Sequence, residues 1–109
     1  MTINEYQEKS LTTFSKSKSS LLWEGATGIN TEAGETLDVL CKYMFQGHPF
    51  DKNHMALELG DVLCYVAVTA HALGYTLEEI MEMNLEKREK RYRGSFSIEK
   101  SLHRQEGDI

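Results

Sequence analysis

Apolar and polar positions recur with a helical period along most of the chain. The clearest run is residues 55–73, MALELGDVLCYVAVTAHAL, where an apolar stripe repeats at three- and four-residue steps. The opposite side of this segment is apolar too, which predicts a helix buried on nearly all sides. Within it, Glu58 and Asp61 project from neighbouring positions. Because unpaired carboxylates are costly to bury, we expect these two to be neutralised, paired or bound to a cation.

Three further helices are predicted around this segment from start and stop signals. Capping boxes, Thr-x-x-Glu, open the first and the last helix, and a Gly-x-Pro sequence ends the second. Either Asp51 or Asn53 can cap the helix that contains residues 55–73. The predicted helices span about residues 3–14, 21–45, 55–73 and 77–92. Four helices with short connections predict an all-α fold, a four-helix bundle.

Length and composition indicate one soluble domain. The 109 residues suit a single compact domain, 1–109, with a C-terminal arm from about residue 94. A formal net charge of -5 argues against nucleic-acid binding. The two acids within residues 55–73 argue against a membrane span.

Cysteine usage and the N-terminal sequence predict a cellular compartment. Cys41 and Cys64 have no zinc-site spacing and lie in helical patterns, which favours buried free thiols in a reducing compartment. The polar N-terminus does not have the pattern of a signal peptide. We therefore expect a cytoplasmic location.

The charges are unevenly distributed. Residues 1–83 carry 12 acidic and 5 basic side chains, whereas residues 87–93 carry five basic side chains and one acid. An acid-rich body with a short basic segment could hold a metal ion beside an anionic substrate. The simpler alternative is a solvated helix end, where cations interact favourably with the helix dipole.

Two acid pairs are the strongest candidates for chemistry. Glu32 and Glu35 stand on the second predicted helix, and Glu58 and Asp61 stand on the third. The 22 residues between Glu35 and Glu58 allow the third helix to run back antiparallel to the second, so that the pairs face each other. Four facing carboxylates repel each other unless cations join them. Oxygen ligands suit Mg²⁺ or Mn²⁺ better than zinc.

The last predicted helix offers groups that can bind phosphate. Asn84, Lys87 and Arg91 share one face of this helix. Their side chains can donate hydrogen bonds to the phosphates of a metal-bound substrate. Other site types are excluded by motif, because the chain has no Glu-x-x-His pair of the di-iron type, no phosphate-binding loop and no nucleophile elbow.

These motifs together resemble a known family. The segments are GINTEAGE at 28–35, ELGDVL at 58–63, Asn84 with Lys87, and RYRGSFSIEKS at 91–101. They are similar to the MazG-type nucleoside triphosphate pyrophosphohydrolases, all-α proteins with a Glu-x-x-Glu and a Glu-x-x-Asp pair at this separation. The resemblance covers about residues 3–104. The chain departs from the family pattern where Ser95 separates the glycine from Phe96.

The resemblance implies an activity and a set of site residues. The reaction is hydrolysis of an NTP or dNTP between the α and β phosphates, which yields a nucleoside monophosphate and pyrophosphate. The implied metal ligands, for Mg²⁺ or alternatively Mn²⁺, are Glu32, Glu35, Glu58 and Asp61. The resemblance implies a catalytic role for Glu32 and Glu35, and which carboxylate acts as the general base stays open. Lys87, with Asn84 and Arg91, would hold phosphate oxygens.

Two further expectations concern the base and the assembly. Trp23 could stack on the nucleotide base, or it could belong to the core or to a subunit interface. The family implies a homo-oligomer, dimer or tetramer, whose neighbouring helices complete the bundle and the sites. Two alternatives to an enzyme remain. One is a non-catalytic helical oligomer that binds nucleotide or a protein partner, with the acids as a structural cation site. The other is a helical scaffold in which the acids form ordinary ion pairs.

Overall fold

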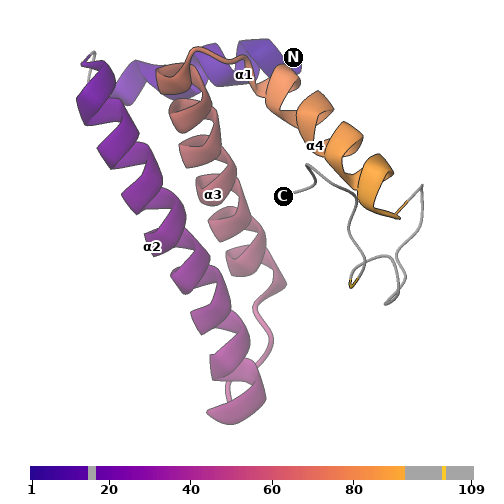
Figure 1. The fold of residues 1–109 in the computed structure, drawn as a ribbon. Helices are drawn as coiled ribbons and strands as arrows, with labels where there is room; N and C mark the ends of the chain where they lie inside the picture. Colours follow the sequence, from indigo (N-terminus) through magenta and orange to yellow (C-terminus); the bar gives the residue numbers. More distant parts are fainter. Residues whose placement is uncertain (15–16, 93–101, 103–109) are drawn as a thin grey trace. The chain divides into compact units, whose positions relative to one another are not determined.

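The computed structural model describes residues 1–14, 17–92 and 102 (Figure 1). The helices are α1 (Ile3–Ser10), the short 3-10 helix η1 (Leu11–Thr13), α2 (Lys18–Phe45), α3 (Lys52–Leu73) and α4 (Leu77–Tyr92). None of the described residues lies in a strand, so the predicted all-α class with four α-helices is confirmed. The predicted C-terminal arm and the RYRGSFSIEKS motif lie almost entirely outside the described residues.

Local signals in the sequence set three of the helix ends. Thr2 accepts a hydrogen bond from the backbone N–H of Glu5 at 3.1 Å, as the first capping box predicts. At the start of α3, the Asp51 carboxylate accepts from the backbone N–H of His54 at 2.9 Å, so Asp51 and not Asn53 is the cap. Gly74 ends α3 with a left-handed backbone, φ 89°, which glycine adopts without strain.

Three predicted boundaries differ from the structure. The third helix begins at Lys52 and not near residue 55, because Asp51 caps it. The first predicted helix ends at Ser10 and tightens into η1, where the sequence pattern extends to residue 14. The second begins at Lys18 and not near residue 21, with Ser17 as its N-cap residue, although the sequence SKSKSS at 15–20 predicts a polar linker there. Serine and lysine are tolerated in a first helical turn, so composition alone does not place this boundary.

Residues Met1–Leu77 form one compact unit. In it, α2 and α3 lie side by side and antiparallel, and α1 lies across the ends opposite their connection (Figure 1). Its buried cluster is small: Leu21 of α2 packs with Val68 and Ala72 of α3, and Leu11 and Phe14 pack against it. This core holds together the ends of α2 and α3 that are covered by α1.

A buried glutamine links α1 to the end of α3. The Gln7 side chain donates from Nε2 to the carbonyl oxygens of Ala67 and Tyr75, both at 3.1 Å. Its Oε1 accepts from the backbone N–H of Leu77 at 3.0 Å. Because three backbone groups depend on one side chain, Gln7 fixes α1 against the turn that follows α3.

Two glycines of α2 allow α3 to approach closely. A Cβ at Gly25 would stand 3.1 Å from Cβ and 3.3 Å from Cα of Thr69, and a Cβ at Gly28 would overlap the ring of Tyr65. Contacts this short leave no room for a side chain. The glycines that weaken the helical pattern of α2 therefore mark its interface with α3.

The expectation that α3 is buried on nearly all sides is wrong within this chain. Val68 is fully buried, but Leu57, Leu63 and Leu73 are 62%, 46% and 58% exposed. The physical reason is that α2 and α1 pack against only part of its circumference. Among the described helices, α3 alone has the length and composition of a membrane-crossing helix, which is weak evidence because core helices share them. Its acids also argue against such a role.

The second unit begins at Glu78 and contains all of α4 except Leu77. Within it, α4 has Glu78 and Glu79 in its first turn and Lys90 and Arg91 in its last turn. This distribution of charge complements the helix dipole. The single-domain organisation stays a prediction.

Candidate metal centre

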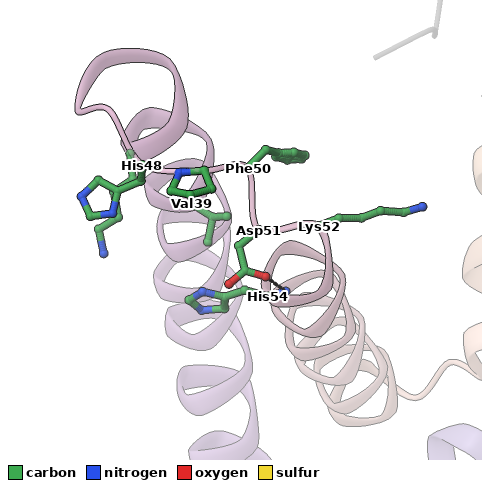
Figure 2. A pocket seen from close by; sticks show the side chains of 8 residues that line it. Val39, His48, Phe50, Asp51, Lys52 and His54 are labelled. Atoms are coloured by element: carbon green, nitrogen blue, oxygen red, sulfur yellow. Dashed lines mark hydrogen bonds between the residues drawn. The ribbon is translucent and has the colours of Figure 1, made fainter.

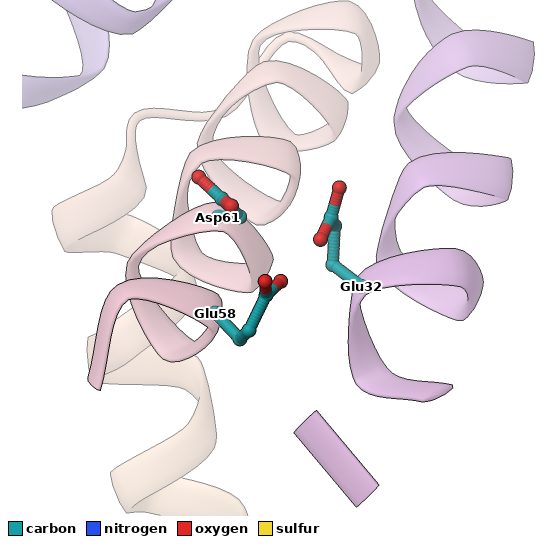
Figure 3. A group of neighbouring side chains, drawn as sticks. All are labelled: Glu32, Glu58 and Asp61. Carbon is teal, nitrogen blue, oxygen red and sulfur yellow. The ribbon is translucent and has the colours of Figure 1, made fainter. Parts of the chain in front are cut away.

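Three carboxylates from two helices converge between α2 and α3. Glu32 extends from α2, and Glu58 and Asp61 extend from α3 toward it (Figure 3). One oxygen atom of each carboxylate lies within 4.8 Å of one oxygen atom of each of the others. The antiparallel pairing of α2 and α3 brings these residues together, as their spacing in the sequence suggests.

The centre concentrates negative charge in a partly buried place. The Oε2 atoms of Glu32 and Glu58 are buried and have no hydrogen-bond partner among the described residues. A hydrogen bond with Glu58, together with burial and the nearby Glu35, raises the pKa of Glu32 to about 7. The same hydrogen bond lowers the pKa of Glu58. Glu32 therefore holds a proton more readily than an isolated glutamate does, and a bound cation would compete with that proton.

Glu35 lies beside this group. It is exposed on α2 and is not one of the three clustered carboxylates. The nearby Glu35 side chain helps to raise the pKa of Glu32 and to lower that of Glu58. The structure thus brings all but one of the predicted metal ligands into a tight group and leaves Glu35 next to it.

A tyrosine and a further acid lie near the centre, and sequence reasoning missed both. Burial raises the pKa of Tyr65, and the negative charges of Glu32, Asp61 and Glu24 raise it further. The Oε2 atom of Glu24 is buried without a partner among the described residues. Glu24 precedes Glu32 by eight residues, about two helical turns, so its place on the same side of α2 was readable from the sequence.

A histidine contacts one of the clustered carboxylates. Nε2 of His54 lies 3.2 Å from Oε1 of Glu58, and the Glu58 side chain is only 12% exposed. Sequence reasoning missed this pair, although the four-residue spacing on one helix was a signal for it. His54 also lines a cavity of about 440 Å³ at the α2–α3 connection (Figure 2). The cavity is lined by Val39, Lys42, His48, Pro49, Phe50, Asp51, Lys52 and His54.

The other predicted site residues lie elsewhere. Trp23 is on α2 and is 74% exposed, so its alternative as a core residue is wrong, while base stacking and a subunit interface both stay predictions. Asn84, Lys87 and Arg91 are on α4 in the second unit, and their contact with substrate stays a prediction. Cys41 and Cys64 are both free and half-buried.

The donor atoms fit a hard divalent cation. The clustered ligands are all carboxylate oxygens, which Mg²⁺ and Mn²⁺ prefer. Two of these carboxylates have a buried oxygen atom with no hydrogen-bond donor among the described residues, which a cation would satisfy. Substitution of a cation for the proton on Glu32 would also relieve the repulsion that raises its pKa.

Comparison with known proteins gives one family. The family model of the MazG nucleotide pyrophosphohydrolase domain matches residues 26–96, which is more than half of the chain. The matched segment contains Glu32, Glu35, Glu58 and Asp61, and also the α4 residues, whereas Trp23 precedes it. No curated protein and no solved structure matches the chain.

Proposed function

Because this chain belongs to the family of MazG nucleotide pyrophosphohydrolase domains, we propose that it hydrolyses a nucleoside triphosphate. The substrate is an NTP or dNTP, the products are the nucleoside monophosphate and pyrophosphate, and the cofactor is Mg²⁺ or, in its place, Mn²⁺. The observation that carries this proposal is the convergence of Glu32, Glu58 and Asp61 inside the matched segment.

The carboxylates have distinct roles in the proposal. Glu32, Glu58 and Asp61 hold the cation, and Glu35 completes the ligand set from the neighbouring turn of α2. When bound, a divalent cation neutralises charge on the phosphate oxygens and lowers the pKa of a coordinated water molecule. Glu32 or Glu35 accepts the proton of the attacking water as general base. Either residue is suitable, since the two stand one turn apart on α2.

Basic, amide and aromatic side chains bind the rest of the substrate. Lys87, Asn84 and Arg91 share a face of α4, and we assign to them hydrogen bonds to the phosphate oxygens. Trp23 offers an exposed aromatic surface on which the base can stack. These four assignments rest on the type and spacing of the residues.

We also propose that the protein is a homo-oligomer, a dimer or a tetramer. The support is the apolar surface that α2 and α3 leave exposed in a single chain. Leu37, Leu57, Leu63 and Leu73 are each about half exposed or more. Burial of apolar area stabilises association by roughly 25 cal/mol per Å². A neighbouring copy would supply the burial that the sequence of α3 predicts.

Pyrophosphate release tests the proposed reaction. Purified protein is incubated with a panel of NTPs and dNTPs, with Mg²⁺ and then with EDTA. We expect metal-dependent release that Glu35→Gln and Asp61→Asn reduce by at least about 100-fold, as for loss of a group that acts in the transition state. Asp38→Asn is the matched control, because Asp38 is an exposed acid of α2 paired with Lys42.

Two results would contradict the proposal. Release that persists undiminished in EDTA, or in both variants, would separate the reaction from this cluster. No release from any nucleotide, by folded protein that binds Mg²⁺, would favour the non-catalytic nucleotide-binding oligomer instead.

A further inference from the structure

The contact between His54 and Glu58 lies on the edge of the metal centre. Both residues are on α3, and Nε2 of His54 is 3.2 Å from Oε1 of Glu58. Glu58 is at the same time one of the three carboxylates that converge with Glu32 and Asp61. The imidazole therefore contacts a predicted metal ligand without belonging to the cluster itself.

His54 is held at the start of α3 by a hydrogen bond of its backbone. Its backbone N–H is bound by the Asp51 carboxylate at 2.9 Å, which fixes the first turn of α3 (Figure 2). The side chain is 50% exposed, whereas the Glu58 side chain is 12% exposed. His54 thus reaches from a solvated, capped turn to a carboxylate that is mostly withdrawn from water.

The two oxygen atoms of Glu58 have different surroundings. Oε1 has the imidazole as a partner, while Oε2 is buried and has no hydrogen-bond partner among the described residues. A histidine N–H that binds one oxygen restrains rotation of the carboxylate and leaves the other oxygen available to a cation. In known metal sites, loss of a group that hydrogen-bonds to a ligand and orients it typically costs about 10–100-fold in metal affinity or activity.

We propose that His54 is a positioning residue of the metal centre. Its Nε2–H donates to Oε1 of Glu58 and holds that carboxylate in the orientation that binds a divalent cation together with Glu32 and Asp61. This inference rests on the proposed function, because it requires that the carboxylates bind a cation. It adds a residue outside the two acid pairs to the set that determines metal affinity.

If His54 and Glu58 formed only an ordinary pair on the helix surface, a different effect on metal binding would be expected. A pair spaced four residues apart on an exposed helix contributes only slightly to stability and has no effect on the binding of a cation. The two roles are therefore separated by metal affinity, measured directly, and not by stability alone.

The experiment is a titration of the 109-residue chain with Mn²⁺, monitored by calorimetry and by the electron paramagnetic resonance signal of free Mn²⁺. We expect His54→Ala to raise the Kd for Mn²⁺ by about 10-fold, the lower end for loss of such an orienting group. His54→Gln retains an N–H donor at this position and should recover most of the affinity. His48→Ala is the matched control, because His48 lines the same cavity and is exposed.

Folding and turnover complete the test. Thermal unfolding without metal should show His54→Ala to be folded, within a few degrees of the wild type. Pyrophosphate release by His54→Ala should require more Mg²⁺ for half-maximal rate, with a maximal rate close to that of the wild type when Mg²⁺ is saturating.

The outcomes distinguish this inference from the proposed function. If the wild type binds Mn²⁺ and His54→Ala binds it equally well, His54 has no positioning role and the cation centre stands. Equal losses in His54→Ala and His48→Ala would attribute the effect to the cavity and would also overturn the inference. If the wild type binds no Mn²⁺, both the cation centre and the role of His54 are overturned.

Discussion

The ring of Tyr65 on α3 lies against Gly28 on α2, so closely that a methyl group at Gly28 would overlap it. Gly28 is four residues before Glu32, and Tyr65 is four residues after Asp61. Because α2 and α3 are antiparallel, this contact lies one helical turn from the clustered carboxylates. The glycine therefore helps to set the separation of the two helices at the metal centre.

The first prediction concerns Gly28→Ala. The added methyl group must displace the Tyr65 ring or move α2 away from α3, and overpacking of this kind typically costs about 1–3 kcal/mol. We expect a lower free energy of unfolding in urea and weaker Mg²⁺ binding. Gly34→Ala is the matched control on the same helix, since nothing lies within 4 Å of a Cβ there. It should be stabilising by up to about 1 kcal/mol. Equal effects of the two substitutions would show that the Tyr65 contact does not limit the packing.

A second prediction follows from the buried side chain of Gln7. Gln7→Ala leaves the Leu77 N–H and the carbonyls of Ala67 and Tyr75 without this partner. A buried polar group left unsatisfied costs about 1–3 kcal/mol. We expect a loss of at least this size in urea denaturation, and faster hydrogen exchange at Leu77. The exposed Gln46→Ala should change stability by less than about 0.5 kcal/mol. A Gln7→Ala protein as stable as the control would mean that water replaces the bonds.

The third prediction concerns repulsion among the carboxylates. Asp61→Asn removes one of the negative charges around Glu32 and should raise the melting temperature of metal-free protein. The same change should reduce the stabilisation by Mg²⁺, which for the wild type is about 2.7 kcal/mol when the free ion is at 100 times its Kd. Calorimetric scans with and without Mg²⁺ measure both effects. Asp38→Asn should respond to Mg²⁺ as the wild type does, and no response in any of the three proteins would exclude the site.

The pH dependence of stability gives the fourth prediction. The pKa of Glu32 is raised to about 7 in the folded protein, from 4.5 for an unperturbed glutamate. Between these values the folded state binds more protons than the unfolded chain. The contribution of Glu32 is therefore fully present below pH 4.5 and is lost as pH rises through 7. The lowered pKa of Glu58 acts in the opposite direction, but below pH 4.5.

Urea denaturation of metal-free protein at a series of pH values tests this sign. We expect the free energy of unfolding to fall between about pH 4.5 and 7 in the wild type more steeply than in Glu32→Gln. Saturating Mg²⁺ should reverse the slope, because the cation binds the ionised carboxylates and competes with protons. Parallel curves for the wild type and Glu32→Gln would show that Glu32 titrates normally.

The sequence was informative about features that depend on neighbours along the chain. The caps at Thr2 and Asp51 and the glycine end at Gly74 follow from local hydrogen bonding and backbone freedom. The approach of Glu32 to Glu58 was also predictable. The acids are spaced by one helical turn on each helix, and the 22 residues between Glu35 and Glu58 are enough for the third helix to run back antiparallel to the second. Even the contact of His54 with Glu58 was available, because residues four apart on a helix are neighbours.

Other features could not be read from the pattern. Gln7 looks like any polar residue of a short helix, and its three partners lie 60 to 70 residues further along the chain. The burial of α3 was overestimated because it, too, depends on contacts with distant parts of the chain. Hydrophobic periodicity reports how much apolar surface a helix has, but not how many helices of one chain are available to cover it.

The sequence by itself determined the helical class of this protein, the ends of most helices and the acid pairs on α2 and α3, because these depend on periodicity and short-range bonding. Only the tertiary structure decided that Glu32, Glu58 and Asp61 form the tight group while Glu35 stands beside it, and that the pKa of Glu32 is raised. Distances between side chains on different helices are set by packing, here by Gly25 and Gly28 against Thr69 and Tyr65, and electrostatic interactions follow those distances.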